Sequence, residues 1–239
     1  MTTNCGAGRS PGIHLVSGAT SGIGHAIFQL LVDQGEQVVP VVRSASQAEA
    51  LGVTEWLQAD FECLAESRAA FRAFDRPIDS FINCAGIAVG KPIWDNDDDE
   101  IQRLLNINLI SPMVACGELR GKIKKGGAIV LFSSQSAFRG GWDDVYIASK
   151  GGINSLVKSL AQKMAPDVRV IGVAPGVTAD TRMTRERKQD DLSAVVQQVP
   201  LRRLAQPQEI AALVLSLLGP AGAHMTGSMI DVNGGAYLR

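Results

Sequence analysis

The chain has 239 residues, of which 46% are hydrophobic and 20% are charged, so it can form one domain with a sizeable core. Its formal net charge of −1 argues against nucleic acid or an anionic membrane surface as the main partner. The apolar run with the best claim to span a bilayer, residues 210–218, is far shorter than the roughly 20 residues required, so no membrane partner is expected.

Cysteine and histidine positions give no sign of a metal site. Cys5, Cys63, Cys84 and Cys116 have neither metal-ligand spacing nor a C-x-x-C pair, and the three histidines are scattered. The chain opens without the charged and apolar segments of an export signal, which favours a cytoplasmic protein with reduced thiols. We therefore predict a cytoplasmic location and no metal.

Apolar segments typical of strands alternate with helical patterns along the chain. Strands are expected at residues 13–17, 37–42, 55–59, 80–83, 128–132, 168–173 and 228–232, and helices near 24–34, 62–74, 100–122, 145–164 and 208–218. This alternation predicts an α/β fold, a single Rossmann-like doubly wound domain over residues 12–239, whose seven-stranded parallel sheet has helices on both faces. Pro40 is awkward in the second strand because it cannot donate a ladder hydrogen bond. Residues 1–11 show little periodicity and are expected to form a mobile tail.

The first expected strand leads into a glycine-rich turn, SGATSGIG at residues 17–24, and then into a helical pattern. This order is typical of the first unit of a dinucleotide-binding sheet, where the turn lets the backbone approach a pyrophosphate and the helix N-terminus faces its charge. The glycines are spaced G-x-x-x-G-x-G rather than G-x-G-x-x-G, and glycine also serves ordinary tight turns.

The segment YIASK at residues 146–150 places a phenol and an ammonium four residues apart, with Ser133 and Ser134 about a dozen residues upstream. On a helix these two side chains share a face, so the Lys150 charge can lie beside the Tyr146 oxygen. At roughly 4 Å and an effective dielectric of about 20, that charge contributes about 4 kcal/mol, or about three pKa units, towards ionising the phenol, and desolvation opposes part of this. Tyr146 could then exchange protons near neutral pH, although Tyr-x-x-x-Lys also occurs by chance on helices.

From about Gly12 to the C-terminus, the chain resembles the short-chain dehydrogenases/reductases of the compact, roughly 250-residue type. The resemblance rests on several motifs in the family's order: SGATSGIG (17–24), Asp60 after the third strand, NCAG (83–86), Asn108 within LLNINL, LFSSQS (131–136), YIASK (146–150), APG (174–176) and TGSMIDVNGG near the end.

The resemblance implies four catalytic residues. Tyr146 would be the general acid in carbonyl reduction and the general base in alcohol oxidation, while Lys150 would lower the pKa of Tyr146 and bind the nicotinamide ribose. Ser134, with Ser133 as the alternative, would hydrogen-bond the reacting oxygen. Asn108 would connect Lys150 to solvent through its backbone carbonyl and a water, or satisfy a distortion of its helix, or do both.

The resemblance also implies a nicotinamide cofactor, whose binding residues follow the motifs. The pyrophosphate and adenosine side would meet Gly18, Thr20, Ser21, Gly22, Ile23 and Gly24. Asp60 and Phe61 would meet the adenine edge, unless Asp60 is only a turn or cap residue. Asn83, Ala85 and Gly86 would close over the adenosine ribose, and Pro175, Gly176, Val177 and Thr178 would pass the nicotinamide.

The end of the second strand predicts which cofactor is preferred. An NAD-dependent enzyme usually has an acidic residue there to bind the ribose 2′-hydroxyl. This chain has Arg43 and Ser44 instead, with no acid and a guanidinium suited to a 2′-phosphate, so NADP(H) is predicted over NAD(H). An exposed arginine in a turn is the alternative interpretation, and Pro40 could shift the register by one residue.

Two positions depart from the family pattern. Cys84 stands where the family often has a second asparagine, and Asp180 stands where it usually has a threonine, with Thr181 one residue later. Either the loop carries an extra residue, or Thr178 alone contacts the nicotinamide. Residues 179–200 are rich in Arg, Gln and Asp and are expected to form the substrate lid.

The sequence therefore predicts an NADP(H)-dependent oxidoreductase that acts on a small-molecule carbonyl or secondary alcohol. An alternative enzyme is a 3-oxoacyl carrier-protein reductase. A different class, a cofactor-binding regulatory module without turnover, would be favoured only if Tyr146 or Lys150 were absent. The resemblance also implies a homotetramer, with a dimer as the other possibility.

Overall fold

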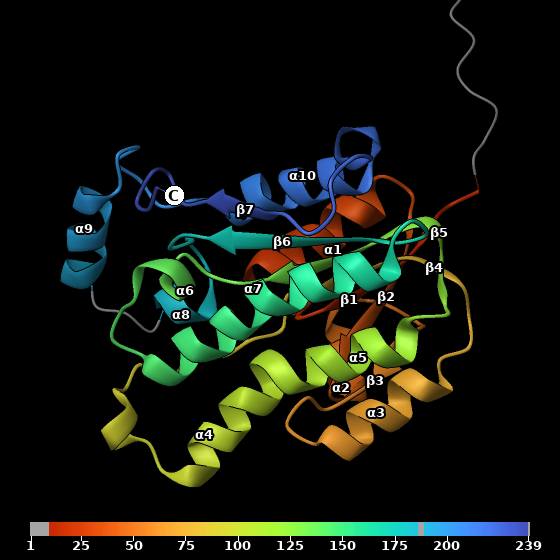
Figure 1. Cartoon of the computed structure of the whole chain (residues 1–239), viewed down its shortest axis with the longest axis horizontal. Helices are drawn as coiled ribbons and strands as arrows, with labels where there is room; N and C mark the ends of the chain where they lie inside the picture. The colour runs from red at the N-terminus through yellow and green to blue at the C-terminus, as the bar shows by residue number, and fades with distance from the viewer. Residues whose placement is uncertain (1–9, 186–188, 239) are drawn as a thin grey trace, which may run out of the picture.

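In the computed structural model, which describes residues 10–185 and 189–238, parallel strands form one sheet in the order β3-β2-β1-β4-β5-β6-β7 (Figure 1). The strands are β1 (Ile13–Ser17), β2 (Gln37–Val42), β3 (Leu57–Gln58), β4 (Ile78–Asn83), β5 (Ile123–Phe132), β6 (Arg169–Pro175) and β7 (Met229–Val232). After β3 the chain crosses back to place β4 beside β1, so the strand order reverses between these two strands. Doubly wound sheets bind their ligands at such a reversal, beyond the carboxyl ends of the strands.

Helices cover both faces of the sheet (Figure 1). They are α1 (Gly22–Asp33), α2 (Ala45–Ala50), α3 (Leu64–Ala73), α4 (Asp98–Leu105), α5 (Ser111–Leu119), α6 (Ser136–Arg139), α7 (Asp144–Met164), α8 (Arg182–Arg185), α9 (Gln189–Gln198) and α10 (Pro207–Leu218). Two short 3₁₀ turns, η1 (Ile93–Asp95) and η3 (Pro220–Gly222), and one π-helical turn, η2 (Asn106–Ile110), complete the described elements. None of these helices is both long enough and apolar enough to cross a membrane.

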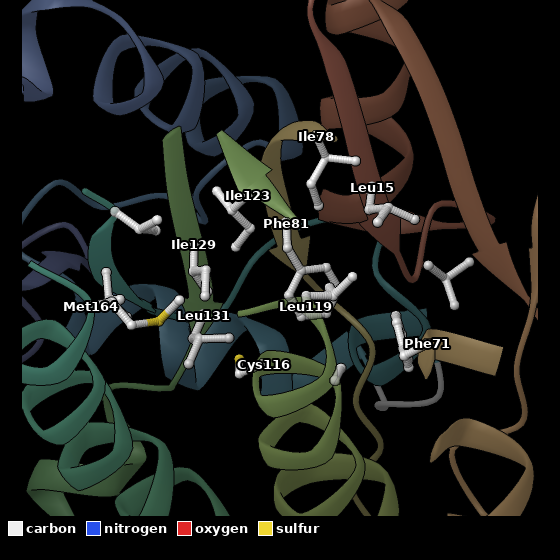
Figure 2. Close-up of a cluster of buried hydrophobic side chains, with 14 of the residues drawn as sticks. Leu15, Phe71, Ile78, Phe81, Cys116, Leu119, Ile123, Ile129, Leu131 and Met164 are labelled. Atoms are coloured by element: carbon white, nitrogen blue, oxygen red, sulfur yellow. The ribbon is translucent and has the colours of Figure 1, made fainter. Parts of the chain in front are cut away.

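The buried strands place alternate residues in two hydrophobic cores. Leu15 and Phe81 belong to the core under α3, α5 and α7, while the next residues, Val16 and Ile82, belong to the core under α1 and α10. Figure 2 shows the first core, where Phe81 lies between the sheet and Leu119. This alternation is the period of two that a strand imposes, and it explains why strands buried on both faces read as nearly continuous apolar runs.

The predicted fold class is confirmed, and the corrections concern element boundaries and four helices that were not expected, α2, α6, α8 and α9. The expected helix at 100–122 is interrupted, because Asn106–Ile110 form a π-helical turn in which the Ser111 N–H bonds to the Asn106 carbonyl, and β5 already begins at Ile123. The third strand keeps only Leu57–Gln58 of the expected 55–59. The predicted mobile tail at residues 1–11 lies almost wholly outside the described residues.

The short third strand also resolves the position of Pro40. Pro40 lies within β2, opposite Val16 of β1, whereas β3 pairs with β2 only at Val41 and Val42. At Pro40, β2 therefore has no strand partner on its β3 side among the described residues. A residue without an N–H is tolerated at such an edge position.

Candidate active site

The turn between β1 and α1 leaves the N-terminus of α1 open. Among the described residues no side chain caps this helix, and its first turn carries no acidic residue. The first N–H groups of a helix lack intrahelical partners, so they can bind an anion. Thr20 and Ser21 are exposed beside the half-buried Gly22 and Ile23, and Gly24 is buried.

Gly18 keeps this turn close to the loop that follows β4. Its φ is +71°, and a Cβ at this position would lie 2.8 Å from the Ala85 nitrogen. Any larger residue would therefore be both strained and crowded. A missed residue, Ser17, also joins the two segments: its hydroxyl donates to Asn83 Oδ1 over 2.7 Å and accepts from the Ala85 N–H over 3.2 Å.

Asn83 is fully buried at the carboxyl end of β4. With Oδ1 bound to Ser17, its Nδ2 group has no hydrogen-bond partner within the described part of the chain. A buried donor without a partner is costly, and it is expected where a ligand supplies the missing acceptor.

Arg43 and Ser44 follow β2 at the same edge of the sheet. The Arg43 side chain is 57% exposed, and its Nη1 lies 3.8 Å from Glu62 Oε1, which also accepts from Arg103 Nε over 2.9 Å. Ser44 is the N-cap residue of α2, and its hydroxyl lies 2.9 Å from that of Ser46. The guanidinium is therefore accessible and only loosely paired.

Asp60 and Phe61 are held by local structure. Asp60 Oδ1 accepts from the Glu62 N–H over 2.9 Å, which is the turn role considered for an isolated aspartate. The Phe61 ring lies in the core, 6.0 Å from the Phe71 ring, so only its backbone remains available to a ligand.

Tyr146 and Lys150 lie on the first turns of α7 and face each other. Lys150 Nζ is 5.8 Å from the centre of the Tyr146 ring and donates to the Phe132 carbonyl over 2.9 Å. Asp143 caps the helix by accepting from the Tyr146 N–H over 3.0 Å. The helical spacing therefore brings the two side chains together as predicted, although the cation faces the ring and is anchored to β5.

Burial sets the electrostatics around Lys150. This side chain is 4% exposed, and desolvation lowers its pKa from 10.5 to about 8. The ammonium still carries its charge at neutral pH. Burial also raises the pKa of the neighbouring Cys84 thiol, so Cys84 stays neutral.

The two serines after β5 have different partners. The Ser133 hydroxyl donates to the Lys150 carbonyl over 3.0 Å and is thereby used in fastening β5 to α7. The Ser134 hydroxyl accepts from the Ser136 N–H over 3.1 Å, which leaves its proton for donation to another oxygen. This difference favours Ser134 as the serine that binds a reacting oxygen.

Asn108 lies in the π-helical turn and is fully buried. Its side chain bonds both backbone groups of Ile87 over 2.8 Å, and its Nδ2 lies 3.1 Å from Ser149 Oγ. A Cβ on Gly86 would lie 3.3 Å from Asn108 Oδ1 and 3.2 Å from Lys150 Nζ, so the loop after β4 passes directly over this pair.

The segment after β6 reaches back to the glycine-rich turn. The Gly176 N–H donates to the Val232 carbonyl, and the Thr178 hydroxyl donates to the Gly176 carbonyl. Asp180 has a φ of +54°, and a Cβ on Gly22 would lie 3.2 Å from the Thr181 side chain. This geometry favours the alternative in which the loop carries an extra residue, at Asp180. The extra residue places Thr181, whose role the sequence did not decide, against the glycine-rich turn.

These features share the edge of the sheet formed by the carboxyl ends of β1, β2, β4, β5 and β6. A parallel doubly wound sheet with an open helix N-terminus after β1, and a tyrosine-lysine pair beside it, defines a dinucleotide-dependent oxidoreductase. Within the described ranges, no three side chains of metal-ligating type gather into a possible metal site.

Comparison with known proteins identifies the family. A family model described as enoyl-(acyl carrier protein) reductase matches residues 18–237. The chain is 34% identical to a 3-oxoacyl-[acyl-carrier-protein] reductase of Vibrio harveyi and 31% identical to an acetoacetyl-CoA reductase of Allochromatium vinosum, covering 95% of this chain and 97% and 98% of theirs. A short-chain dehydrogenase/reductase structure from Brucella melitensis superposes with a TM-score of 0.88 at 31% identity, covering 95% of this chain and 97% of that one. The chain belongs to the short-chain dehydrogenase/reductase family and is an oxidoreductase acting on carbonyl and alcohol groups with NAD(P)(H).

Both forms of the cofactor occur among the structural neighbours. A blue fluorescent protein from a metagenomic library, in complex with NADPH, has a TM-score of 0.85 at 28% identity and covers 95% of this chain and 98% of that one. A 4-hydroxyisoleucine dehydrogenase complexed with NADH has a TM-score of 0.86 at 26% identity and covers 93% and 97%.

Proposed function

We propose that this protein interconverts a ketone and a secondary alcohol, with Tyr146 as the general acid and base, and that NADP(H) is its preferred cofactor. The observation that carries the assignment is the buried Lys150 ammonium, 5.8 Å from the Tyr146 ring at the ligand-binding edge of the sheet. A cation this close to the ring favours the charged phenolate that proton transfer leaves on Tyr146.

The residues present fit a dinucleotide. The open N-terminus of α1 suits a pyrophosphate. The Nδ2 group of Asn83, which has no hydrogen-bond partner among the described residues, marks a buried place for an acceptor. Gly18 allows the backbone to pass where a side chain would collide, and Gly86 keeps the loop after β4 in tight contact with Asn108 and Lys150. When bound, the cofactor supplies or accepts the hydride. Gly18 to Gly24, Asn83 to Gly86 and Pro175 to Thr178 would hold it.

The chain's own residues move the proton. During reduction, the Tyr146 hydroxyl donates its proton to the oxygen of the substrate, and during oxidation the phenolate takes the proton back. Ser134 donates a hydrogen bond to that same oxygen, while Lys150 stabilises the phenolate. Asn108 holds the loop after β4 against this group, and we retain the proposal that its backbone carbonyl and a water connect Lys150 to solvent.

Replacing Tyr146 with phenylalanine tests the assignment, because it removes the transferred proton and keeps the ring. Turnover with any accepted ketone should fall by at least about 10²-fold, with the cofactor dissociation constant nearly unchanged. Tyr237, the second of the two tyrosines, stacks on Phe138, so Tyr237→Phe is a matched control. Near-normal turnover of Tyr146→Phe would contradict the role of Tyr146 as general acid and base.

A 3-oxoacyl thioester is the substrate class that the relatives favour. The names of two relatives specify a 3-oxoacyl carrier protein and acetoacetyl-CoA. Acetoacetyl-CoA is therefore the first substrate to test, with crotonyl-CoA to detect enoyl reduction. Activity on simple ketones but not on acetoacetyl-CoA would reject this narrower assignment and leave the oxidoreductase intact.

The preference for NADP(H) rests on Arg43. Its accessible guanidinium can form a bidentate contact with a 2′-phosphate, and no acidic residue stands at the end of β2 to repel that phosphate. Glu62 opposes the preference, since its carboxylate lies 3.8 Å from Arg43 Nη1. Arg43→Ala should lower kcat/KM for NADPH about tenfold and leave that for NADH nearly unchanged, whereas Glu62→Gln should favour NADPH further.

Titrating the apoenzyme with each nucleotide gives the same comparison without turnover. Arg68→Ala, which removes an arginine paired with Glu118 elsewhere on the surface, is the control. A wild-type enzyme that binds NADH as tightly as NADPH would overturn the cofactor preference alone.

Residues 179–200 are proposed to cover the substrate. A bridge between Thr178 and Ala205, with the Ala179 N–H bound to the Ala205 carbonyl, closes the base of this segment. Limited proteolysis within the segment should slow when NADP(H) and a substrate are added together. Cleavage at an unchanged rate would argue against a lid.

We also propose a cytoplasmic homotetramer. β7 is the last strand of the sheet, and an edge strand is a common place for a second copy to pack in a closed assembly. Sedimentation should show a species of about four times the 25.3 kDa chain mass. A single species at the chain mass would reject the oligomer.

A further inference from the structure

We propose that Asp143 is a positioning residue, whose carboxylate holds Tyr146 and the loop after β4 in one geometry. The inference rests on the proposed role of Tyr146. Asp143 directly precedes α7, and an Asp three residues before the tyrosine is a signal for a helix N-cap.

One carboxylate binds two separate segments. Asp143 Oδ1 accepts from the N–H of Tyr146 over 3.0 Å. Its Oδ2 accepts from the N–H groups of Val89 and Gly90 over 2.8 and 2.7 Å. Three backbone donors therefore converge on a single side chain, and the two carboxylate oxygens offer acceptors for all of them.

The loop that Asp143 holds is the one that lines the tyrosine-lysine pair. Gly86 passes over Lys150, Ile87 is held by Asn108 through both backbone groups, and the Ile93 N–H donates to Asp144 Oδ2 over 2.9 Å. Asp143 fastens the middle of this loop, between the Asn108 and Asp144 attachments. Because the same side chain also fixes the backbone of Tyr146, a shift of the loop and a shift of the catalytic hydroxyl are coupled.

A serine substitution separates the two functions of Asp143. Serine is a good N-cap, so Asp143→Ser keeps an acceptor for the Tyr146 N–H, but its side chain is too short to reach Val89 and Gly90. Asp97 provides the matched control for the cap, since it caps α4 by accepting from the Glu100 N–H. Its carboxylate attracts the Lys91 ammonium of this loop, but within the described part of the chain it accepts no hydrogen bond from the Val89 or Gly90 N–H. Asp97→Ser thus tests an equal change at another helix start.

The kinetic constants discriminate positioning from general stability. Asp143→Ser should lower kcat for reduction of acetoacetyl-CoA, or of another accepted ketone, by about 10- to 100-fold, as a misplacement of about 1 Å can cost. Its melting temperature should fall by only a few degrees, because two hydrogen bonds of a partly exposed loop are lost, and its dissociation constant for NADPH should stay close to that of the wild type. Asp97→Ser should change none of the three. A wild-type kcat in Asp143→Ser would overturn the proposal.

Hydrogen exchange provides a readout that does not depend on turnover, and its measurement in the wild type needs no variant. In the wild-type protein the amides of Val89 and Gly90 should exchange slowly, and in Asp143→Ser they should exchange at least about tenfold faster. Exchange of these two amides at the rate of an open peptide in the wild type would overturn the clamp. Should Tyr146→Phe retain turnover, the proposed function would fail even with both amides protected, so the two failures are distinguishable.

Discussion

Replacing Lys150 with methionine should stabilise the fold while abolishing turnover. Lys150 is buried, and desolvation lowers its pKa from 10.5 to about 8, so the native state is penalised for carrying this charge. Methionine is unbranched, flexible and uncharged, and it can fill the same space without that penalty.

The magnitude follows from the two pKa values. At pH 7, below both of them, the ammonium is charged in the folded and unfolded states, and the pKa difference corresponds to about 3 kcal/mol of lost stability. Methionine also leaves the Phe132 carbonyl without its 2.9 Å bond from Nζ, at a cost of about 1 kcal/mol. We therefore expect the variant to be about 2 kcal/mol more stable at pH 7.

The pH dependence has a definite sign. Because the folded pKa lies below the unfolded one, the unfolded state binds more protons between about pH 8 and 10.5, and wild-type stability rises with pH across that window. At about pH 9.5 the penalty has fallen to about 1 kcal/mol, so the advantage of the methionine variant should nearly vanish.

Urea unfolding of both apoproteins at pH 7 and about pH 9.5, together with kcat, measures these effects. Lys158→Met, at an exposed position on the same helix, is the control and should stay within about 0.5 kcal/mol of the wild type. If Lys150→Met is no more stable than the wild type at pH 7, or if its advantage does not change with pH, burial of the ammonium does not destabilise the fold.

Gly18→Ala should weaken NADPH binding at least about tenfold in a fluorescence titration, whereas Gly126→Ala, also at positive φ (+82°) but in open space, should cost only about 1 kcal/mol of stability; equal effects on binding would contradict the close approach. Phe81→Ala should destabilise the protein by about 3–5 kcal/mol in urea, against about 1 kcal/mol for Ile129→Val, since both side chains are fully buried. Asp180→Gly should raise the free energy of unfolding by up to about 1 kcal/mol, because glycine adopts a φ of +54° without strain; a loss of stability would show that contacts of the aspartate side chain outweigh the strain.

Local sequence patterns were sufficient for the fold class and for the pairing of Tyr146 with Lys150. Strand and helix periods are properties of short segments, and residues four apart share a helix face whatever surrounds them. The glycine-rich turn can likewise be predicted from the sequence, because its conformation depends on a few consecutive residues.

Other features depend on residues far apart in the chain. The third strand is short because β2 offers it only Val41 and Val42, and the helix expected at 100–122 is broken by a π-helical turn that places Asn108 against Ile87. Neither has a local signature, since each depends on what packs against the segment. The different partners of Ser133 and Ser134 likewise follow from where α7 lies relative to β5.

The alternating α/β architecture, the family and the types of side chain at the site can be inferred from the sequence, because they follow from periodicity and from ordered motifs. Three features become visible only in the folded chain: the strong desolvation of Lys150, the contact of Thr181 with Gly22, and the hydrogen bonds by which Asp143 joins the start of α7 to Val89 and Gly90. Burial and hydrogen bonds across 50 or more positions are set by the packing of the whole sheet, and no window of sequence contains both partners.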